Sequence, residues 1–127
     1  MKLFSVEEAN ALLPTVRQIL LRIQRAFRRL ASYQEEARRA AEGAELGGGG
    51  MINGPQYVSL LIDLYASASE LETLGVQLKD QERGLIDFPS MRDGRVVLLC
   101  WHLGEGDRIE WWHDVEAGFA GRQPLEP

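Results

Sequence analysis

Apolar residues in the first third of the chain recur at spacings of three and four, which places them on one face of a helix. The residues of this face are Val16, Ile19, Leu20, Ile23, Ala26, Phe27 and Leu30. Ser5 lies three residues before Glu8, the spacing of a capping box, so the helix is expected to begin there. Pro14 either kinks this helix or separates a short helix from a longer one.

A second set of apolar residues with the same period follows Pro55, which suits the first turn of a helix. Its members are Tyr57, Leu60, Leu61, Leu64, Ala68, Leu71, Leu74 and Leu78. The helix is expected to end by Gly84, so each helix would run for roughly 28 residues, or about 42 Å. The glycines at positions 47–50 form the turn between the helices. These features predict an antiparallel helical hairpin over about residues 5–83.

The charges of the two predicted helices are complementary. Residues 15–39 contain seven arginines and two acids, whereas residues 57–82 contain five acids and one lysine. An antiparallel alignment that brings opposite charges together pairs Arg17 with Asp80, Arg25 with Glu72, and Arg28 with Glu70. Each exposed pair would contribute about 0.2–1 kcal/mol, so the pairs would mainly fix the register of the hairpin.

The apolar pattern changes after Gly84 from a helical period to that of short strands. The predicted strands are Leu85–Pro89, Arg95–Leu103 and Arg108–His113. Asp93-Gly94 and residues 104–107 supply the turns, and the tail beyond Asp114 is expected to be irregular. The sequence therefore predicts one α+β domain, in which the α-hairpin is followed by a short antiparallel β-meander and tail over about residues 85–127.

Composition and charge limit the classes of function. A chain of 127 residues is expected to form a single domain, and its net charge of −5 argues against binding nucleic acid. No apolar run approaches the ~20 residues of a membrane span, so no membrane association is expected. The single cysteine, Cys100, and the lack of a signal peptide favour a reducing cytoplasm.

A single copy of this chain has too few elements to cover its predicted apolar surface. The middle strand is apolar on both faces, and the second helix carries apolar residues outside its main face. These residues are Val58, Ile62, Tyr65 and Val76. A homodimer that completes a four-helix bundle would bury them, so self-association is expected.

Several segments carry a pattern that extends over nearly the whole chain. They are residues 4–10, Leu13-Pro14, Gly75–Asp80, Gly84–Pro89, Cys100-Trp101, Trp112-His113 and Gly118–Arg122. In these segments the chain resembles a family of uncharacterised, mostly bacterial proteins, catalogued as domain of unknown function 2203. The resemblance implies no activity. It does imply that the pattern of the family includes Asp80, Asp87, Trp112, His113 and Arg122.

Cys100, His102 and His113 are residue types that bind zinc. Cys100 and His102 share one face of the middle strand, and one register of the following strand brings His113 to that face, opposite Leu98. His102 would then lie roughly 13 Å from His113, so the three residues are not expected to bind one ion. A shift of the register by one residue would move His113 off this face.

Asp87 and His113 lie on the outer strands of the predicted meander, where a carboxylate could orient an imidazole as a general base. The favoured alternative is a hydrogen bond that fixes the His113 ring inside a cluster of tryptophans. A metal site is a less favoured interpretation, and its candidate ligands are Asp80, Asp87, Cys100 and His113. No cofactor is expected apart from such a divalent metal.

Two glycines in the segment Gly118–Arg122 flank Phe119, and an arginine follows. Exposed backbone amides together with Arg122 could bind an anion. The favoured alternative is that Phe119 anchors the tail on the core while Arg122 pairs with an acid.

Any functional site is expected on the meander and tail, with Asp87, Trp112, His113 and Arg122 as candidate residues. The sequence favours a small cytoplasmic dimeric binding or assembly module without catalytic activity. The alternative is a small metal-dependent or acid–base enzyme whose site lies around Asp87 and His113.

Overall fold

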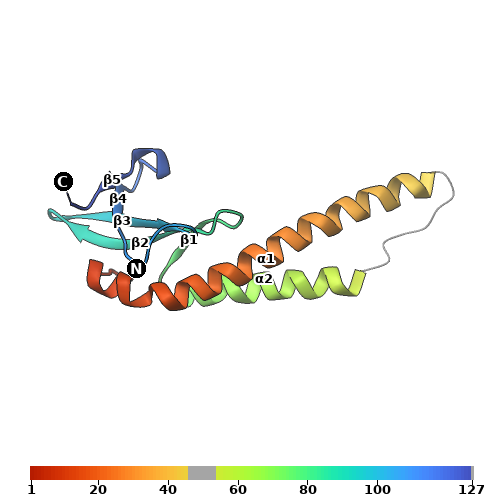
Figure 1. Cartoon of the computed structure of the whole chain (residues 1–127), viewed down its shortest axis with the longest axis horizontal. Coiled ribbons are helices and arrows are strands. Elements are labelled where there is room, and N and C mark those ends of the chain that lie inside the picture. Colours follow the sequence, from red (N-terminus) through yellow and green to blue (C-terminus); the bar gives the residue numbers. More distant parts are fainter. Residues whose placement is uncertain (46–53, 127) are drawn as a thin grey trace.

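The computed structural model describes residues 1–45 and 54–126 of the chain. Two antiparallel helices, α1 (Val6–Glu45) and α2 (Gly54–Leu74), precede a five-stranded antiparallel sheet (Figure 1). The predicted α+β fold with a helical hairpin is therefore confirmed. The turn predicted at residues 47–50 lies outside the described residues. Within the described residues, neither helix combines the length and the apolar character that crossing a membrane requires.

The start of α1 agrees with the prediction. The backbone N–H of Glu8 donates to Ser5 Oγ and that of Ser5 donates to Glu8 Oε1, each over 3.0 Å, which completes a capping box. α1 continues through Pro14, so the alternative in which Pro14 separates two helices is wrong. Leu13 and Val16 on either side of Pro14 are buried, and their packing offsets the ~3 kcal/mol that an interior proline costs.

α2 is shorter than predicted, because it ends at Leu74 and not near Gly84. Gly75 adopts a φ of 89°, and the N–H groups of Gly75 and Val76 donate to carbonyl groups in the last turn of α2. This pair of hydrogen bonds is a Schellman motif, which ends the helix. The chain then continues as strand β1 (Gln77–Asp80).

The strands of the sheet lie side by side in the order of the chain. After β1 they are β2 (Leu85–Arg92), β3 (Arg95–His102), β4 (Trp111–Asp114) and β5 (Gln123–Pro124). The sequence predicts β2, β3 and β4, although β2 is longer and β4 shorter than expected, and it does not predict β1 or β5. Asp93 and Gly94 turn the chain with positive φ of 52° and 79°, as a type I′ hairpin turn requires. His113 pairs with Leu98, so the register considered for this pair of strands is confirmed.

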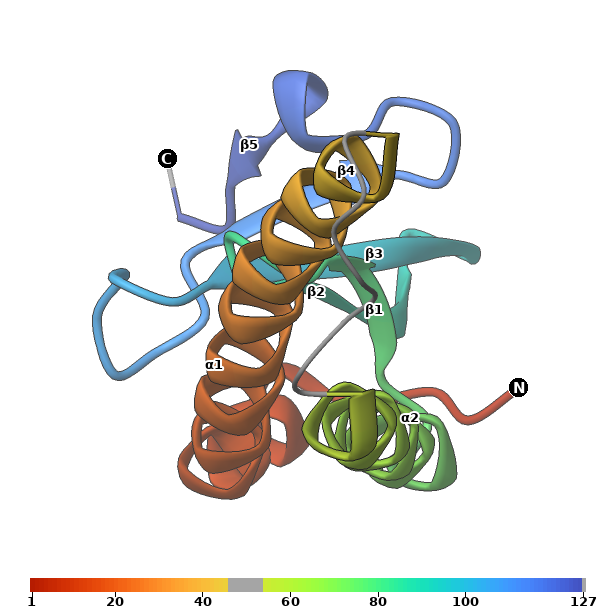
Figure 2. The ribbon, with the colours of Figure 1, turned by 90° about the vertical axis from the view of Figure 1, so that its right-hand side faces the viewer.

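The two faces of the sheet are covered by different parts of the chain. One face packs on α1 and α2 in the main core, which includes Phe88, Leu99 and Trp101 (Figures 1 and 2). The C-terminal tail covers the other face, and its 3₁₀ helix η1 (Phe119–Gly121) lies on the side of the sheet away from α2. The tail therefore covers the second apolar face of β3, which the sequence alone assigns to a partner copy.

The ion pairs of the hairpin differ from those predicted. They join Arg17 to Asp107 over 3.1 Å, Arg22 to Glu70 over 2.6 Å and Arg28 to Glu82 over 2.8 Å. The predicted partners of Arg17 and Arg28 are therefore wrong. The reason is that α2 ends before Asp80, which moves the acids beyond it to the sheet. Among the described residues no ion pair joins Arg25 to Glu72, so this predicted pair is not formed either.

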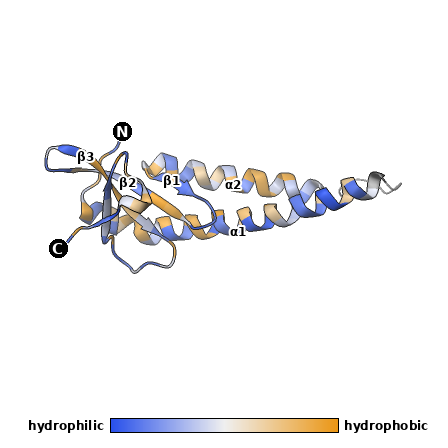
Figure 3. Cartoon of the chain, turned by 90° about the horizontal axis from the view of Figure 1, so that it is seen from above, coloured by the Kyte–Doolittle hydropathy of each residue, from blue (hydrophilic) through white to orange (hydrophobic). Residues whose placement is uncertain are grey.

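The part of the hairpin far from the sheet has little core of its own. Figure 3 shows that α1 becomes hydrophilic toward its end, whereas α2 keeps apolar residues there. Val58, Ile62 and Tyr65 of α2 are 54, 63 and 77% exposed. Val76, which the sequence groups with them, is buried.

Candidate metal centre

Three strands bring Asp87, Cys100 and His113 to the tail-covered face of the sheet. Asp87 of β2 pairs directly with Cys100 of β3, and His113 of β4 pairs with Leu98 of β3. Directly paired residues project to the same face, as do residues two apart on one strand. The side chains of β2 and β4 therefore meet over β3, which lies between them.

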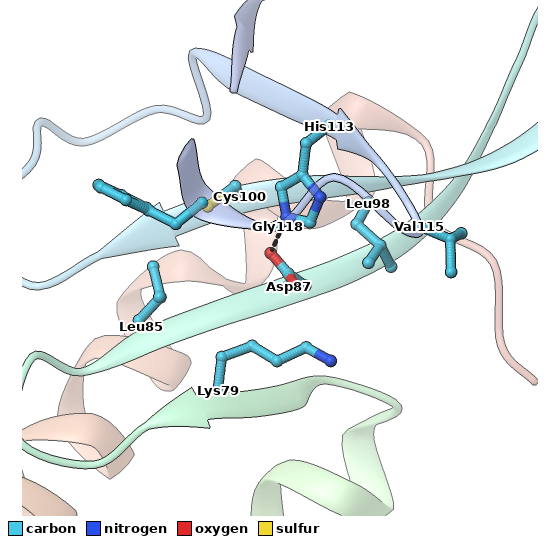
Figure 4. Close-up of a pocket in the computed structure, with 9 residues that line it drawn as sticks. Lys79, Leu85, Asp87, Leu98, Cys100, His113, Val115 and Gly118 are labelled. Atoms are coloured by element: carbon cyan, nitrogen blue, oxygen red, sulfur yellow. Dashed lines mark hydrogen bonds and ion pairs between the residues drawn. The ribbon is translucent and has the colours of Figure 1, made fainter. Parts of the chain in front are cut away.

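The three polar side chains lie close together and are nearly inaccessible to solvent. His113 Nε2 lies 3.1 Å from Asp87 Oδ1 (Figure 4). One ligand atom from each of Asp87, Cys100 and His113 lies within 4.8 Å of the other two. The exposed fractions of the three residues are 2, 1 and 2%. The predicted meeting of Asp87 and His113 across the meander is therefore confirmed.

The hydrogen bonds of His113 determine which ring nitrogen carries a hydrogen. Nδ1 lies 2.8 Å from the backbone carbonyl of Asp114, and this oxygen can only accept, so Nδ1–H donates to it. Nε2 faces Asp87, and a hydrogen bond there requires a proton on one of the two groups. A histidine that binds a metal uses the same arrangement, with one N–H held by a carbonyl and the other nitrogen directed at the ion.

The Cys100 thiol is poorly suited to act as a nucleophile. Burial, and after it the charge of Asp87, raises its pKa from the ordinary value of 9.0 to about 12. The thiol therefore keeps its proton near neutral pH and lacks the reactivity of a thiolate. A divalent cation would change this, because a thiol that coordinates a metal is deprotonated.

A cavity of about 180 Å³ adjoins the three residues. Its apolar walls come from Leu85, Leu98, Val115 and Phe119, and Lys79 is the cationic residue among those that line it (Figure 4). The network borders a space that can hold a small ligand.

Phe119 holds the tail over this cavity. Its ring lies between the guanidinium groups of Arg83 and Arg122, which are 4.2 and 4.7 Å from the ring centroid. Arg122 also pairs with Glu105 over 2.6 Å and stacks on Trp111 at 4.8 Å. The predicted pairing of Arg122 with an acid is therefore confirmed, and Phe119 anchors the tail between arginines.

Two of the candidate residues lie away from the cluster. Trp112 belongs to the main core on the other face of the sheet, with the guanidinium of Arg92 4.9 Å from its ring. Asp80 Oδ1 accepts the backbone N–H of Arg83 over 3.0 Å, in the turn between β1 and β2. His102 is also separate, as predicted, and its Nδ1 lies 2.7 Å from the carbonyl of Leu103.

Lys79 and Val115 line the cavity but are not among the residues that the sequence singles out. The sequence places Lys79 in the second helix and Val115 in an irregular tail. The alternation of apolar Val76 and Leu78 with polar Gln77 and Lys79 is the signal that identifies β1. No comparable pattern surrounds Val115.

The cluster lies within a region shared with a known family. The family described as uncharacterized conserved protein DUF2203 matches the chain over residues 2–125. The chain belongs to the DUF2203 family. The resemblance seen in the sequence is thereby confirmed, and the match includes all three residues of the cluster. No curated protein and no solved structure matches this DUF2203 chain.

Proposed function

We propose that this DUF2203 protein binds one divalent transition metal ion, of the zinc type, through Asp87, Cys100 and His113. The supporting observation is that a carboxylate, a thiol and an imidazole converge within 4.8 Å beside a cavity. These groups are the three kinds of ligand that zinc takes from proteins. Three protein ligands leave a fourth tetrahedral position, which the cavity makes accessible.

The charges of the cluster suit a divalent ion. The Asp87 carboxylate and a Cys100 thiolate carry two negative charges, and a neutral His113 ring adds none. A divalent ion therefore makes the buried site neutral, which avoids the cost of an unpaired buried charge. Ligand atoms around a tetrahedral zinc ion lie about 3.5 Å apart, so small side-chain rotations bring the cluster to that geometry. The Asp114 carbonyl already orients the His113 ring.

Metal analysis of the tag-free full chain tests this proposal. The protein is incubated with zinc, dialysed against metal-free buffer and analysed for bound metal. We expect about one equivalent of zinc in the native protein and little in His113→Ala or Cys100→Ser. His102→Ala is the matched control, because His102 lies on the same sheet outside the cluster, and it should bind as the native protein does.

Cobalt(II) provides a second measurement of the same site. A cobalt ion bound through Cys100 should show a thiolate-to-metal absorption band that Cys100→Ser lacks. Equal zinc binding by the native protein and the two cluster variants would refute the proposal, and so would no binding by any of them.

A second candidate function is the assembly of two chains through α2. Its support is the exposure of Val58, Ile62 and Tyr65 on the part of α2 that has little core beneath it. Pairing two hairpins would complete a four-helix bundle and remove this apolar surface from water.

Sedimentation equilibrium at micromolar concentration tests the assembly. We expect a particle of twice the chain mass of 14.3 kDa. Ile62→Asp should shift the particle toward the monomer, whereas Ser59→Asp at an exposed polar position of the same helix should not. A native protein that sediments only as the monomer would exclude this function.

We also propose that the protein works in the cytoplasm. The support is that Cys100 must stay unoxidised to bind a metal, and the cytoplasm is a reducing compartment. Fractionation of host cells with an antibody against the chain would test the location.

A further inference from the structure

Lys79 is a charged residue on the cavity wall whose role the metal site leaves unexplained. It lies on β1, next to the strand that carries Asp87, and its side chain runs alongside Asp87 in Figure 4. It is exposed, and no hydrogen bond or ion pair joins it to another of the described residues. An unpaired ammonium group therefore borders the space beside the candidate metal ligands.

The charge of the cavity favours an anion at this point. Asp87, a Cys100 thiolate and a divalent ion sum to zero, so Lys79 would give the metal-loaded cavity a net positive charge. Arg122, which lies near Cys100, is already paired with Glu105. Lys79 is therefore the cation available to a ligand that enters the cavity.

The apolar walls of the cavity limit which chemical groups such an anion can have in addition to its charged group. Leu85, Leu98, Val115 and Phe119 offer apolar surface but no side-chain hydrogen-bonding groups. A phosphate has several oxygens that each need a partner, and these walls would leave some of them unsatisfied. A carboxylate with a short aliphatic body fits this cavity better, because its charged end can face Lys79 and its apolar end can pack on these walls.

We infer that the cavity takes a small aliphatic monocarboxylate, whose carboxylate binds the metal ion and Lys79 together. This inference rests on the proposed metal site. One carboxylate oxygen would take the fourth position at the ion in place of a water molecule, and the other oxygen would accept a hydrogen bond from the Lys79 ammonium. The aliphatic body packs between Val115, Leu98 and Phe119. No covalent bond of the ligand is broken.

Isobutyrate is a suitable probe, with cobalt(II)-loaded full-length protein as the sensor. Exchange of the fourth ligand should change the visible absorption of the bound cobalt, so a titration gives a Kd for isobutyrate. We expect isobutyramide, which has the same shape without the charge, to bind at least about tenfold more weakly. Inorganic phosphate, at the same concentrations, should bind more weakly than isobutyrate as well.

Two lysine variants separate the role of Lys79 from general charge effects. Lys79→Gln should weaken isobutyrate binding about tenfold, equivalent to 1.4 kcal/mol, and Lys79→Arg should restore most of the affinity. Lys2→Gln is the matched control, because Lys2 is the other lysine of the chain and lies over Phe4, with its Nζ 5.1 Å from that ring. This control should bind isobutyrate as the native protein does.

The possible outcomes distinguish this inference from the metal site itself. Failure of the chain to bind cobalt would refute the metal site, and the inference with it. Cobalt binding without a response to isobutyrate would leave the metal site standing and overturn the inference. Equal binding of isobutyrate and isobutyramide, tighter binding of phosphate, or an unchanged Kd in Lys79→Gln would also overturn it.

Discussion

Replacing His113 by alanine removes the ring that links β4 to β2 under the tail. In the native protein this ring donates from Nδ1 to the Asp114 carbonyl and faces Asp87 from Nε2. The Asp87 side chain is only 3% exposed, so the variant leaves a buried carboxyl group without its imidazole partner. An unsatisfied buried group costs ~1–3 kcal/mol, and the space left by the ring adds to that cost. We expect the free energy of unfolding to fall by about 3 kcal/mol.

The melting temperature follows from this value. An unfolding entropy of ~2.1 cal/mol/K per residue gives about 0.27 kcal/mol/K for a chain of 127 residues. A loss of ~3 kcal/mol should therefore lower the melting temperature of the metal-free protein by about 11 °C in differential scanning calorimetry. His102→Ala is the control. The His102 side chain is 27% exposed, and its removal should cost no more than ~1 kcal/mol.

Zinc provides a second readout in the same assay. A ligand present at 100 times its Kd stabilises a protein by ~2.7 kcal/mol, which corresponds here to a rise of about 10 °C. The native protein and His102→Ala should show this rise, and His113→Ala should not. If His113→Ala melts with the native protein in metal-free buffer, the buried pair does not stabilise the fold. If zinc raises the melting temperature of His113→Ala as well, His113 is not a ligand.

Other variants probe the helix end, the tail and the buried thiol. Gly75→Ala should lower the free energy of unfolding in urea by about 1–2 kcal/mol, because alanine disfavours the φ of 89° and its Cβ would lie 3.0 Å from Lys2 Cβ. Gly43→Ala, which has open space around it inside α1, should raise that free energy by about 0.5–1 kcal/mol. Phe119→Ala should speed the reaction of Cys100 with a thiol reagent several-fold at fixed pH, and an unchanged rate would show that Phe119 does not anchor the tail. The metal-free native protein should lose stability in urea as the pH rises above about 9, because the Cys100 pKa is about 12 in the fold and near 9.0 in the unfolded chain. Cys100→Ala should lose less over the same pH range.

The helices could be predicted from the sequence except where one residue overrides the pattern. α1 begins at its capping box because the signal is local, with both hydrogen bonds made between Ser5 and Glu8. The end of α2 cannot be predicted from the apolar spacing, because Leu78 continues the helical spacing of Leu71 and Leu74. Gly75 decides the outcome by taking the left-handed conformation that ends the helix.

In the sheet, too, features that depend on nearby residues are easier to predict than features that depend on pairing with distant strands. The pairing of Leu98 with His113 is the register that a turn at residues 104–107 implies, although the sequence also allowed a shift by one residue and the connection between β3 and β4 spans residues 103–110. β5 is two residues long, too short for a period to appear in the sequence. The alternation around β1 is brief, and Leu78 also fits the helical spacing of Leu71 and Leu74, so the helix pattern hides it. β1 and β5 become strands because β2 and β4 offer them free edges for pairing.

The convergence of Asp87 with His113 followed from strand order, but the cavity beside them could not be predicted. It depends on where the tail lies, and the tail is positioned by the two arginines around Phe119. One of these, Arg83, belongs to the turn that precedes β2, a segment that the sequence assigns to the end of a helix. Because the sequence assigns Arg83 to a helix, it does not reveal that Arg83 packs on Phe119 and helps to hold the tail.

Two apolar surfaces suggest a dimer in the sequence, one on β3 and one on α2, and only the surface on α2 is exposed in the structure. The outer face of β3 is covered within the chain by the tail, and Asp87, Cys100 and His113 lie beneath that cover. The exposed apolar residues lie in the half of α2 that is far from the sheet (Figure 1). Because the two regions share no element, assembly through α2 would neither complete nor block the metal site. Ile62→Asp should therefore keep its zinc, and a dimer that lost zinc with this change would show that the two regions are coupled.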